Sequence, residues 1–198
     1  MANLTTVGDS ENAACTDGNI SAYTINATTG ALSEIAGSPF AAGANPISIT
    51  VSGKFAYAVN WCSGTVSAYT INATSGALTS VGPTVTTGSN PFSVSVDPFS
   101  RFAYVTRAVS ETVGAVSAYT INATTGALTS VGPPVATGWA PSSVSADPSG
   151  RFVHVANFNS NTVSAYTINA TTGALTSIGA AVSAGTSPTS ITITRMIR

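Results

Sequence analysis

The sequence predicts an all-β fold of the β-propeller type, and three observations support this. A phrase close to Val-Ser-Ala-Tyr-Thr-Ile-Asn-Ala-Thr-Thr-Gly-Ala-Leu-Thr occurs four times in the 198 residues. Its copies centre on Tyr23, Tyr69, Tyr119 and Tyr166, which are spaced 46, 50 and 47 residues apart. Each repeat consists of short β-rich runs separated by turn residues, and none shows the 3.6-residue apolar periodicity of a helix. Repeats of this length and content are typical of propeller blades.

The fourth repeat shows how one blade is built. Its first run alternates polar and apolar residues and stops at a turn signal, Asp147-Pro148-Ser149-Gly150. Gly173 lies in the last hairpin loop, where a positive φ is needed. A solenoid is the competing all-β repeat, but it usually has parallel strands, whereas these hairpin loops require antiparallel pairing. Four antiparallel strands are therefore expected, at residues 143–146, 151–156, 162–168 and 174–178.

The two ends of the chain are complementary. The first repeat lacks the leading proline and the first strand, whereas residues 188–194 form a first strand with only four residues after it. We therefore expect one domain, 1–198, in which the C-terminal strand completes blade 1, either in the same molecule or in a neighbour. A closed four-bladed ring, a two-chain eight-bladed ring and a strand-exchanged polymer all agree with this. The expected blades are 1–45 plus 188–198, 46–90, 91–140 and 141–187.

The blade motif resembles that of a known family. Pro-x-Ser-Val-x-x-Asp-Pro-x-x-Arg-Phe-x-x-Val-x-Asn, followed by Thr-Val-Ser-Ala-Tyr-Thr-Ile and Thr-Gly-Ala-Leu-Thr, resembles the lactonase-type β-propeller family. That family includes 6-phosphogluconolactonases and the Tyr-Val-Thr-Asn (YVTN) repeat proteins of bacterial and archaeal surfaces. The resemblance covers essentially the whole chain, although family members typically carry seven blades. It implies lactone hydrolysis, which requires a general base, a cation for an anionic substrate and a polarised water.

The chemical motifs that this resemblance implies are not matched. The enzymes carry a Pro-His pair at the start of a first strand and an Asp-Leu-Gly-x-Asp-Arg run after the second. Here the leading prolines are followed by Ile47, Phe92, Ser142 and Thr189. The loop after the second strand of the fourth repeat reads Asn-Phe-Asn-Ser-Asn-Thr, without Asp or Arg. Similarity of fold alone does not confer function.

Three residues are candidates for catalysis, because the chain has only six Lys and Arg, seven Asp and Glu and one His. His154 lies in a second strand, where the other repeats have Tyr57 and Tyr104, so it is either a general base or an aromatic-like packing residue. Arg107 and Glu111 lie in the longest loop of the third repeat. They either hold a ligand or form a solvated ion pair.

Five residues are predicted to line a binding rim. Trp61 and Phe158 follow equivalent asparagines in their repeats, and Trp139 lies in a linker. Aromatic side chains in such positions can stack on sugars. The predicted rim residues are Trp61, Phe158, Trp139, Asn60 and Asn157.

No metal and no cofactor are expected. Asp97 and Asp147 could bind a cation near a channel, but an Asp-Pro pair more simply opens a turn. Clusters with metal-ligand spacing and Gly-rich phosphate loops do not occur in the sequence. A net charge of −1 without a basic patch argues against nucleic-acid binding. No run approaches 18 apolar residues, so no membrane span is expected.

Cys15 and Cys62 occupy nearly the same place in adjacent repeats, eight and seven residues before the central tyrosines. We predict a disulfide that joins blades 1 and 2, with two buried free thiols as the alternative. Closing a loop of this size stabilises a fold by about 4 kcal/mol in the chain-entropy model. Such a bond would imply an oxidising compartment outside the cytoplasm.

Composition also points away from the cytoplasm. Charged residues make up 7% of the chain, against roughly 25% in ordinary soluble domains. The N-terminus of this sequence shows no signal peptide. Asparagine sequons begin each hairpin loop, where Asn also suits the turn, and they are possible glycosylation sites. These sequons are Asn26, Asn72, Asn122 and Asn169.

Together these observations predict an extracellular or cell-surface repeat protein without catalytic activity, which acts as a binding or self-assembly module. Its partner would be a protein, a carbohydrate or further copies of itself. One alternative is a lactone hydrolase of the 6-phosphogluconolactonase-like type. Another is a filament or surface-layer subunit assembled by exchange of the terminal strand. The sequence leaves open whether the protein is an enzyme.

Overall fold

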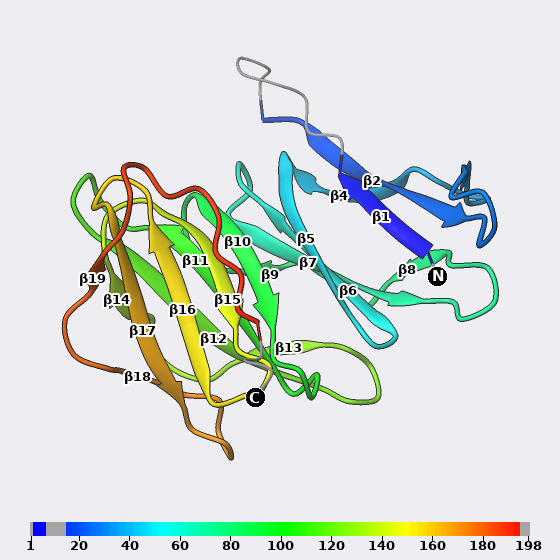
Figure 1. The fold of residues 1–198 in the computed structure, drawn as a ribbon. Helices are drawn as coiled ribbons and strands as arrows, with labels where there is room; N and C mark the ends of the chain where they lie inside the picture. Colours follow the sequence, from blue (N-terminus) through cyan, green and yellow to red (C-terminus); the bar gives the residue numbers. More distant parts are fainter. Residues whose placement is uncertain (1, 7–14, 195–198) are drawn as a thin grey trace.

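The computed structural model describes residues 2–6 and 15–194, with side chains from residue 15 onward. Four antiparallel sheets follow one another along the chain and stack face to face as blades (Figure 1). The described residues form strands and no helix. The all-β, propeller-type fold is thereby confirmed.

The strands of each blade are consecutive in sequence. Blade 1 contains β1 (Ala2–Thr6), β2 (Asp17–Ile25), β3 (Leu32–Glu34) and β4 (Phe40–Ala44). Blade 2 contains β5 (Pro46–Ser52), β6 (Phe55–Asn60), β7 (Thr65–Ile71), β8 (Leu78–Ser80) and β9 (Val85–Thr86). Blade 3 contains β10 (Pro91–Val96), β11 (Phe102–Ala108), β12 (Gly114–Ile121), β13 (Leu128–Ser130) and β14 (Val135–Thr137). Blade 4 contains β15 (Pro141–Ala146), β16 (Phe152–Asn157), β17 (Thr162–Ile168), β18 (Leu175–Ser177) and β19 (Val182–Ser183).

The outer strand of each blade is divided into two pieces, so blades 2 to 4 have five strands where four were expected. In blade 3, β13 pairs with the last three residues of β12, and β14 pairs with its first three. The division follows from a difference in length. β12 has eight residues and β13 only three, so β13 alone cannot pair with the whole of β12. The linker therefore folds back to satisfy backbone groups that would otherwise be unpaired.

Local hydrogen bonds explain the loops. In the last hairpin of blade 3, the Asn122 side-chain oxygen accepts from the backbone N–H groups of Thr124 and Thr125. The other three sequon asparagines make the same pair of bonds. At the first turn of blade 4, the Asp147 carboxylate accepts from the backbone of Arg151 and Phe152. Asp97 accepts from the backbone of Arg101 and Phe102 in the same way, so both aspartates stabilise a turn.

Apolar side chains fill the space between adjacent blades. Tyr57 and Phe55 of blade 2 pack with Val105 and Tyr119 of blade 3 in one buried cluster. The Tyr57 hydroxyl donates to the carbonyl of Gly126, at 3.0 Å. The next interface repeats this arrangement, since Tyr104 of blade 3 donates to the carbonyl of Gly173 in blade 4, at 3.3 Å. Blades 2 and 3 are thus each held by the hairpin of the blade that follows.

A disulfide joins blades 1 and 2. Cys15, just before β2, is bonded to Cys62 in the loop between β6 and β7, and their Cα atoms are 5.6 Å apart. The predicted pairing is confirmed.

The C-terminal segment differs from its prediction. Among the described residues, 188–194 form no strand and no pair with β1. They lie beside β15, where Ile191 donates its N–H to Ser143 Oγ at 3.2 Å. Blades 1 and 4 lie at opposite ends of the row (Figure 1), so this chain does not bring its last segment to its own first blade. Completion of blade 1 by that segment stays a prediction for contact between molecules.

Candidate functional site

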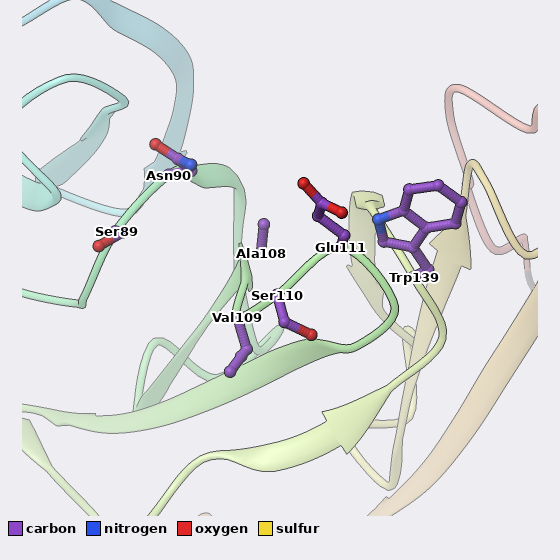
Figure 2. A pocket seen from close by; sticks show the side chains of 7 residues that line it. All are labelled: Ser89, Asn90, Ala108, Val109, Ser110, Glu111 and Trp139. Atoms are coloured by element: carbon purple, nitrogen blue, oxygen red, sulfur yellow. The ribbon is translucent and has the colours of Figure 1, made fainter.

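A pocket of about 350 Å³ opens at the rim of blade 3, beside the linker that leads to blade 4 (Figure 2). The linker before β10 supplies one side, the end of β11 and the loop between β11 and β12 supply another, and the linker before β15 supplies an indole. The lining residues are Ser89, Asn90, Ala108, Val109, Ser110, Glu111 and Trp139.

Backbone hydrogen bonds position this pocket. Ala108 donates its N–H to the carbonyl of Asn90, which ties the end of β11 to the residue before Pro91. Asn90 has a φ of 50°. The loop that carries Glu111 is closed by Val109, which donates to the carbonyl of Val113 at 3.0 Å. The pocket walls are therefore loops and linkers that these bonds hold in place.

Among the lining residues, Glu111 supplies the carboxylate and Trp139 supplies the aromatic ring. Glu111 is exposed, and within the described structure it forms no ion pair. The Trp139 indole and the Glu111 carboxylate line the same pocket and point toward one another in Figure 2, and Trp139 is 38% exposed. The backbone N–H of Trp139 donates to Ser160 Oγ at 2.7 Å, which holds the linker to blade 4. An aromatic face beside a carboxylate suits a polyhydroxylated ligand.

Arg107 lies at the same end of blade 3, but it does not line the pocket. Its guanidinium packs under Gly88, where an added Cβ would come within 3.0 Å of Nη1. Its Nε is buried and has no hydrogen-bond partner among the described residues. The predicted ion pair with Glu111 is not formed. In the described part of the chain, the one salt bridge joins Arg101 and Asp97.

His154 lies apart from this site, in the middle of β16 opposite Ser145 and Ala165. Burial lowers the pKa of its imidazole, and the charge of Asp147 opposes that shift. Nδ1 is buried without a hydrogen-bond partner among the described residues. The three predicted catalytic residues are therefore not assembled in one place, and only Glu111 enters the pocket.

Two predicted rim residues lie inside the fold, which corrects the prediction. Asn60 and Asn157 are both 0% exposed. Each amide nitrogen donates to a Thr and a Ser hydroxyl on the adjacent third strand, as from Asn60 to Thr65 and Ser67. These asparagines fix the start of the third strand and cannot face a ligand on the rim.

Trp61 and Phe158 are half-buried at equivalent places on blades 2 and 4. Their backbone N–H groups donate to the carbonyls of Asn45 and Ala140. Neither lines the described pocket. Ser89 and Asn90 do line it and were not predicted, because an Asn before a proline at a strand start is indistinguishable in sequence from a turn residue.

Within residues 15–194, no three His, Cys, Asp or Glu side chains gather as a metal site would require. No helix long and apolar enough to cross a membrane occurs in the described part of the chain.

Comparison with known proteins places the chain in a family. The Lactonase family, described as a seven-bladed β-propeller, matches residues 11–113 and 101–193. The protein belongs to this lactonase-type β-propeller family. No curated protein matches the sequence.

Solved structures show the same fold. A candidate 6-phosphogluconolactonase from Bacteroides uniformis has a TM-score of 0.77 and 22% identity, over 86% of this chain and 50% of that one. A second from Bacteroides fragilis has a TM-score of 0.73 and 24% identity, over 87% and 50% of the chains. The periplasmic gluconolactonase of Pseudomonas aeruginosa has a TM-score of 0.67 and 19% identity, over 85% and 49%. The chain spans about half the length of these structures.

Proposed function

We propose that the protein binds a sugar-derived lactone in the pocket at the rim of blade 3 and hydrolyses it. The observation that carries this proposal is the pairing of an exposed carboxylate, Glu111, with an aromatic platform, Trp139, in a pocket of about 350 Å³. Membership of the lactonase-type family supports it. So do the fold neighbours, two of which are described as candidate 6-phosphogluconolactonases and one as a gluconolactonase.

The proposed reaction uses Glu111 as a general base. Its carboxylate takes a proton from a water molecule while the water oxygen attacks the lactone carbonyl. The bond between the acyl carbon and the ring oxygen then breaks, and the proton passes to that ring oxygen. The product is the open hydroxy acid. Trp139 would stack on the apolar face of the ring, and Asn90 would hydrogen-bond to a hydroxyl group.

Turnover of glucono-δ-lactone above the uncatalysed rate tests this proposal. Removing a general base typically costs 10²- to 10⁴-fold, so we expect Glu111→Gln to lower kcat by roughly that amount. Glu34→Gln is the matched control, because Glu34 is an exposed glutamate on β3 of blade 1. Equal rates for wild type and Glu111→Gln would overturn the proposed role of Glu111.

A non-catalytic sugar-binding module is the second candidate. It is favoured by the placement of Arg107, whose Nε is buried and whose side chain does not line the pocket, so the pocket lining contains no cation. Quenching of tryptophan fluorescence by gluconate separates the two functions. Quenching that is lost in Trp139→Phe and kept in Trp61→Phe, without any lactone turnover, would establish binding alone.

We further propose that the protein works outside the cytoplasm. The disulfide between Cys15 and Cys62 supports this, because such bonds persist in oxidising compartments. The periplasmic location named for the Pseudomonas aeruginosa gluconolactonase is compatible with it. Glycosylation of the four sequon asparagines remains a prediction that mass measurement of the secreted protein would test.

A further inference from the structure

The outer face of blade 1 exposes side chains whose equivalents in the other blades are buried or partly buried. Leu32 is 54% exposed, whereas its equivalents Leu78, Leu128 and Leu175 are between 7% and 9% exposed. Ile25 is 36% exposed, whereas Ile121 and Ile168 are 8% exposed. In blades 2 to 4 these positions pack against the preceding blade. The described structure places no blade against this face of blade 1.

The face of blade 4 that would contact a following blade is also uncovered. Phe55 and Phe102 are each 4% exposed because a following blade covers them, whereas Phe152 is half-buried. Val182 is 68% exposed, although its equivalents in blades 2 and 3 pack against the interface with the next blade. His154 stands where Tyr57 and Tyr104 donate to a hairpin carbonyl of the next blade.

Glycine packing shows how the two open faces would fit. At Gly126 an added Cβ would lie 2.5 Å from the Phe55 ring of blade 2, and at Gly173 it would lie 2.3 Å from the Phe102 ring of blade 3. Gly30 is the equivalent residue of blade 1 and has nothing within 4 Å of its Cβ position. Within the described structure, blade 1 therefore has a glycine, Gly30, against which no phenylalanine ring packs. We call this position the glycine seat. Blade 4 has a phenylalanine, Phe152, that packs against no such glycine of a following blade.

The C-terminal segment already occupies the place of the innermost strand of a following blade. Ser187, before Pro188, has a φ of 50°, as Asn90 (50°) and Ala140 (51°) have before the first strands of blades 3 and 4. Ile191 donates to Ser143 Oγ in the same register in which Val144 donates to Ser93 Oγ. Blade 1 is the blade that lacks this strand, because β1 pairs with β2 as a second strand and has no strand on its other side in the described residues.

We propose that a second copy of this chain stacks its blade 1 on blade 4 of the first copy. Residues 188–194 of the first copy then become the innermost strand of blade 1 of the second copy. The register of β5 on β6 then places Ile191 opposite Thr5 of the second copy. Gly30 of the second copy receives the Phe152 ring. The interface is head-to-tail, and two copies that use it twice close an eight-bladed ring. The proposal is independent of the proposed lactone hydrolysis, because the rim pocket is formed by blade 3 and its flanking linkers within one chain.

Sedimentation velocity of the 198-residue protein over a range of concentrations tests the interface. We expect wild type at micromolar concentration to have twice the mass of the 19.6 kDa chain. Gly30→Ala adds a methyl group that is free in the isolated chain but would meet Phe152 in the pair. Because overpacking of this kind is costly, the dissociation constant of the Gly30→Ala pair should be at least about tenfold higher than that of wild type.

Matched variants separate this effect from backbone strain. Gly179→Ala is the control for Gly30→Ala, since its φ is 74° and nothing lies within 4 Å of its Cβ position. Leu32→Lys should also dissociate the pair, whereas Val113→Lys, in the loop between β11 and β12, should leave it intact. Larger assemblies that respond to the same variants would support the same interface. A monomer at all concentrations, or a dimer insensitive to Gly30→Ala and Leu32→Lys, would overturn the proposal and point to another cover for these faces, such as further blades of the same polypeptide.

Discussion

Gly126 shows how a single residue decides the spacing between blades. It has a φ of 81°, and an added Cβ would lie 2.5 Å from the Phe55 ring. Glycine is required both for the turn and for the close approach of the neighbouring ring. The repeated Thr-Gly-Ala-Leu sequence therefore encodes blade stacking as well as a hairpin.

We predict that Gly126→Ala lowers the free energy of unfolding by about 2–4 kcal/mol, from strain at positive φ together with overpacking. Gly179→Ala should cost only about 1 kcal/mol, because it carries the backbone strain without the clash. Urea denaturation of both variants measures the difference. Equal losses would show that the Phe55 contact does not contribute.

Tyr57 titrates unusually because it is enclosed between blades. Burial raises the pKa of its hydroxyl to about 12, from an ordinary value of 10. Since the folded-state pKa is the higher one, the unfolded chain releases this proton first as the pH rises. Tyr57 should therefore stabilise the fold fully below pH 10 and progressively lose that contribution between about pH 10 and 12.

Denaturation midpoints measured across this range check the expectation. We expect Tyr57→Phe to be less stable than wild type at pH 8, by about 1–3 kcal/mol, because the Gly126 carbonyl loses its donor. The difference should narrow as the pH rises from 10 to 12. A constant difference across this range would contradict the assigned pKa.

At the scale of elements, the covalent link between blades 1 and 2 is the feature with the largest expected effect. The disulfide joins residues separated by 47 positions. A loop of this size corresponds to about 4 kcal/mol in the chain-entropy model. We predict that the double variant Cys15→Ser with Cys62→Ser loses stability of this order, seen as a lower urea midpoint than for the oxidised wild type. The reduced wild type should behave like the double variant, and a variant as stable as the oxidised protein would refute the prediction.

The strands and their pairing followed from the repeat, because alternation, turn residues and hairpin glycines are local signals. The division of the outer strand did not follow, since β14 and β19 come from linkers whose pairing depends on the length of a distant third strand. Glu111 and Trp139 were both singled out in sequence, but their place in one pocket depends on how the linker that carries Trp139 is held to blade 4. The prediction that Asn60 lies on the rim was wrong. A polar residue at a strand end is usually expected to be exposed, and the sequence does not show that the Ser67 hydroxyl accepts a hydrogen bond from it inside the fold.

At the scale of the whole molecule, the four blades form an open row with a glycine seat at one end and an unmatched phenylalanine at the other. The internal interfaces show what such faces bind, because each one joins the same two surfaces. Blade stacking by head-to-tail contact explains, on one physical basis, the exposed Leu32, the half-buried Phe152 and the position of residues 188–194. The rim pocket belongs to a single chain, so ligand binding and assembly can be tested separately.

Amide hydrogen exchange of residues 188–194 at high and low protein concentration tests this central claim most directly. Within one chain the segment forms no strand, and the Ile191 N–H bonds only to a side chain. In the pair, the segment would form ladder hydrogen bonds with β1 of the second copy, and the bonded amides should exchange much more slowly. We predict protection at high concentration that disappears on dilution and in Gly30→Ala. Rapid exchange at every concentration, with the rest of the fold protected, would contradict the account.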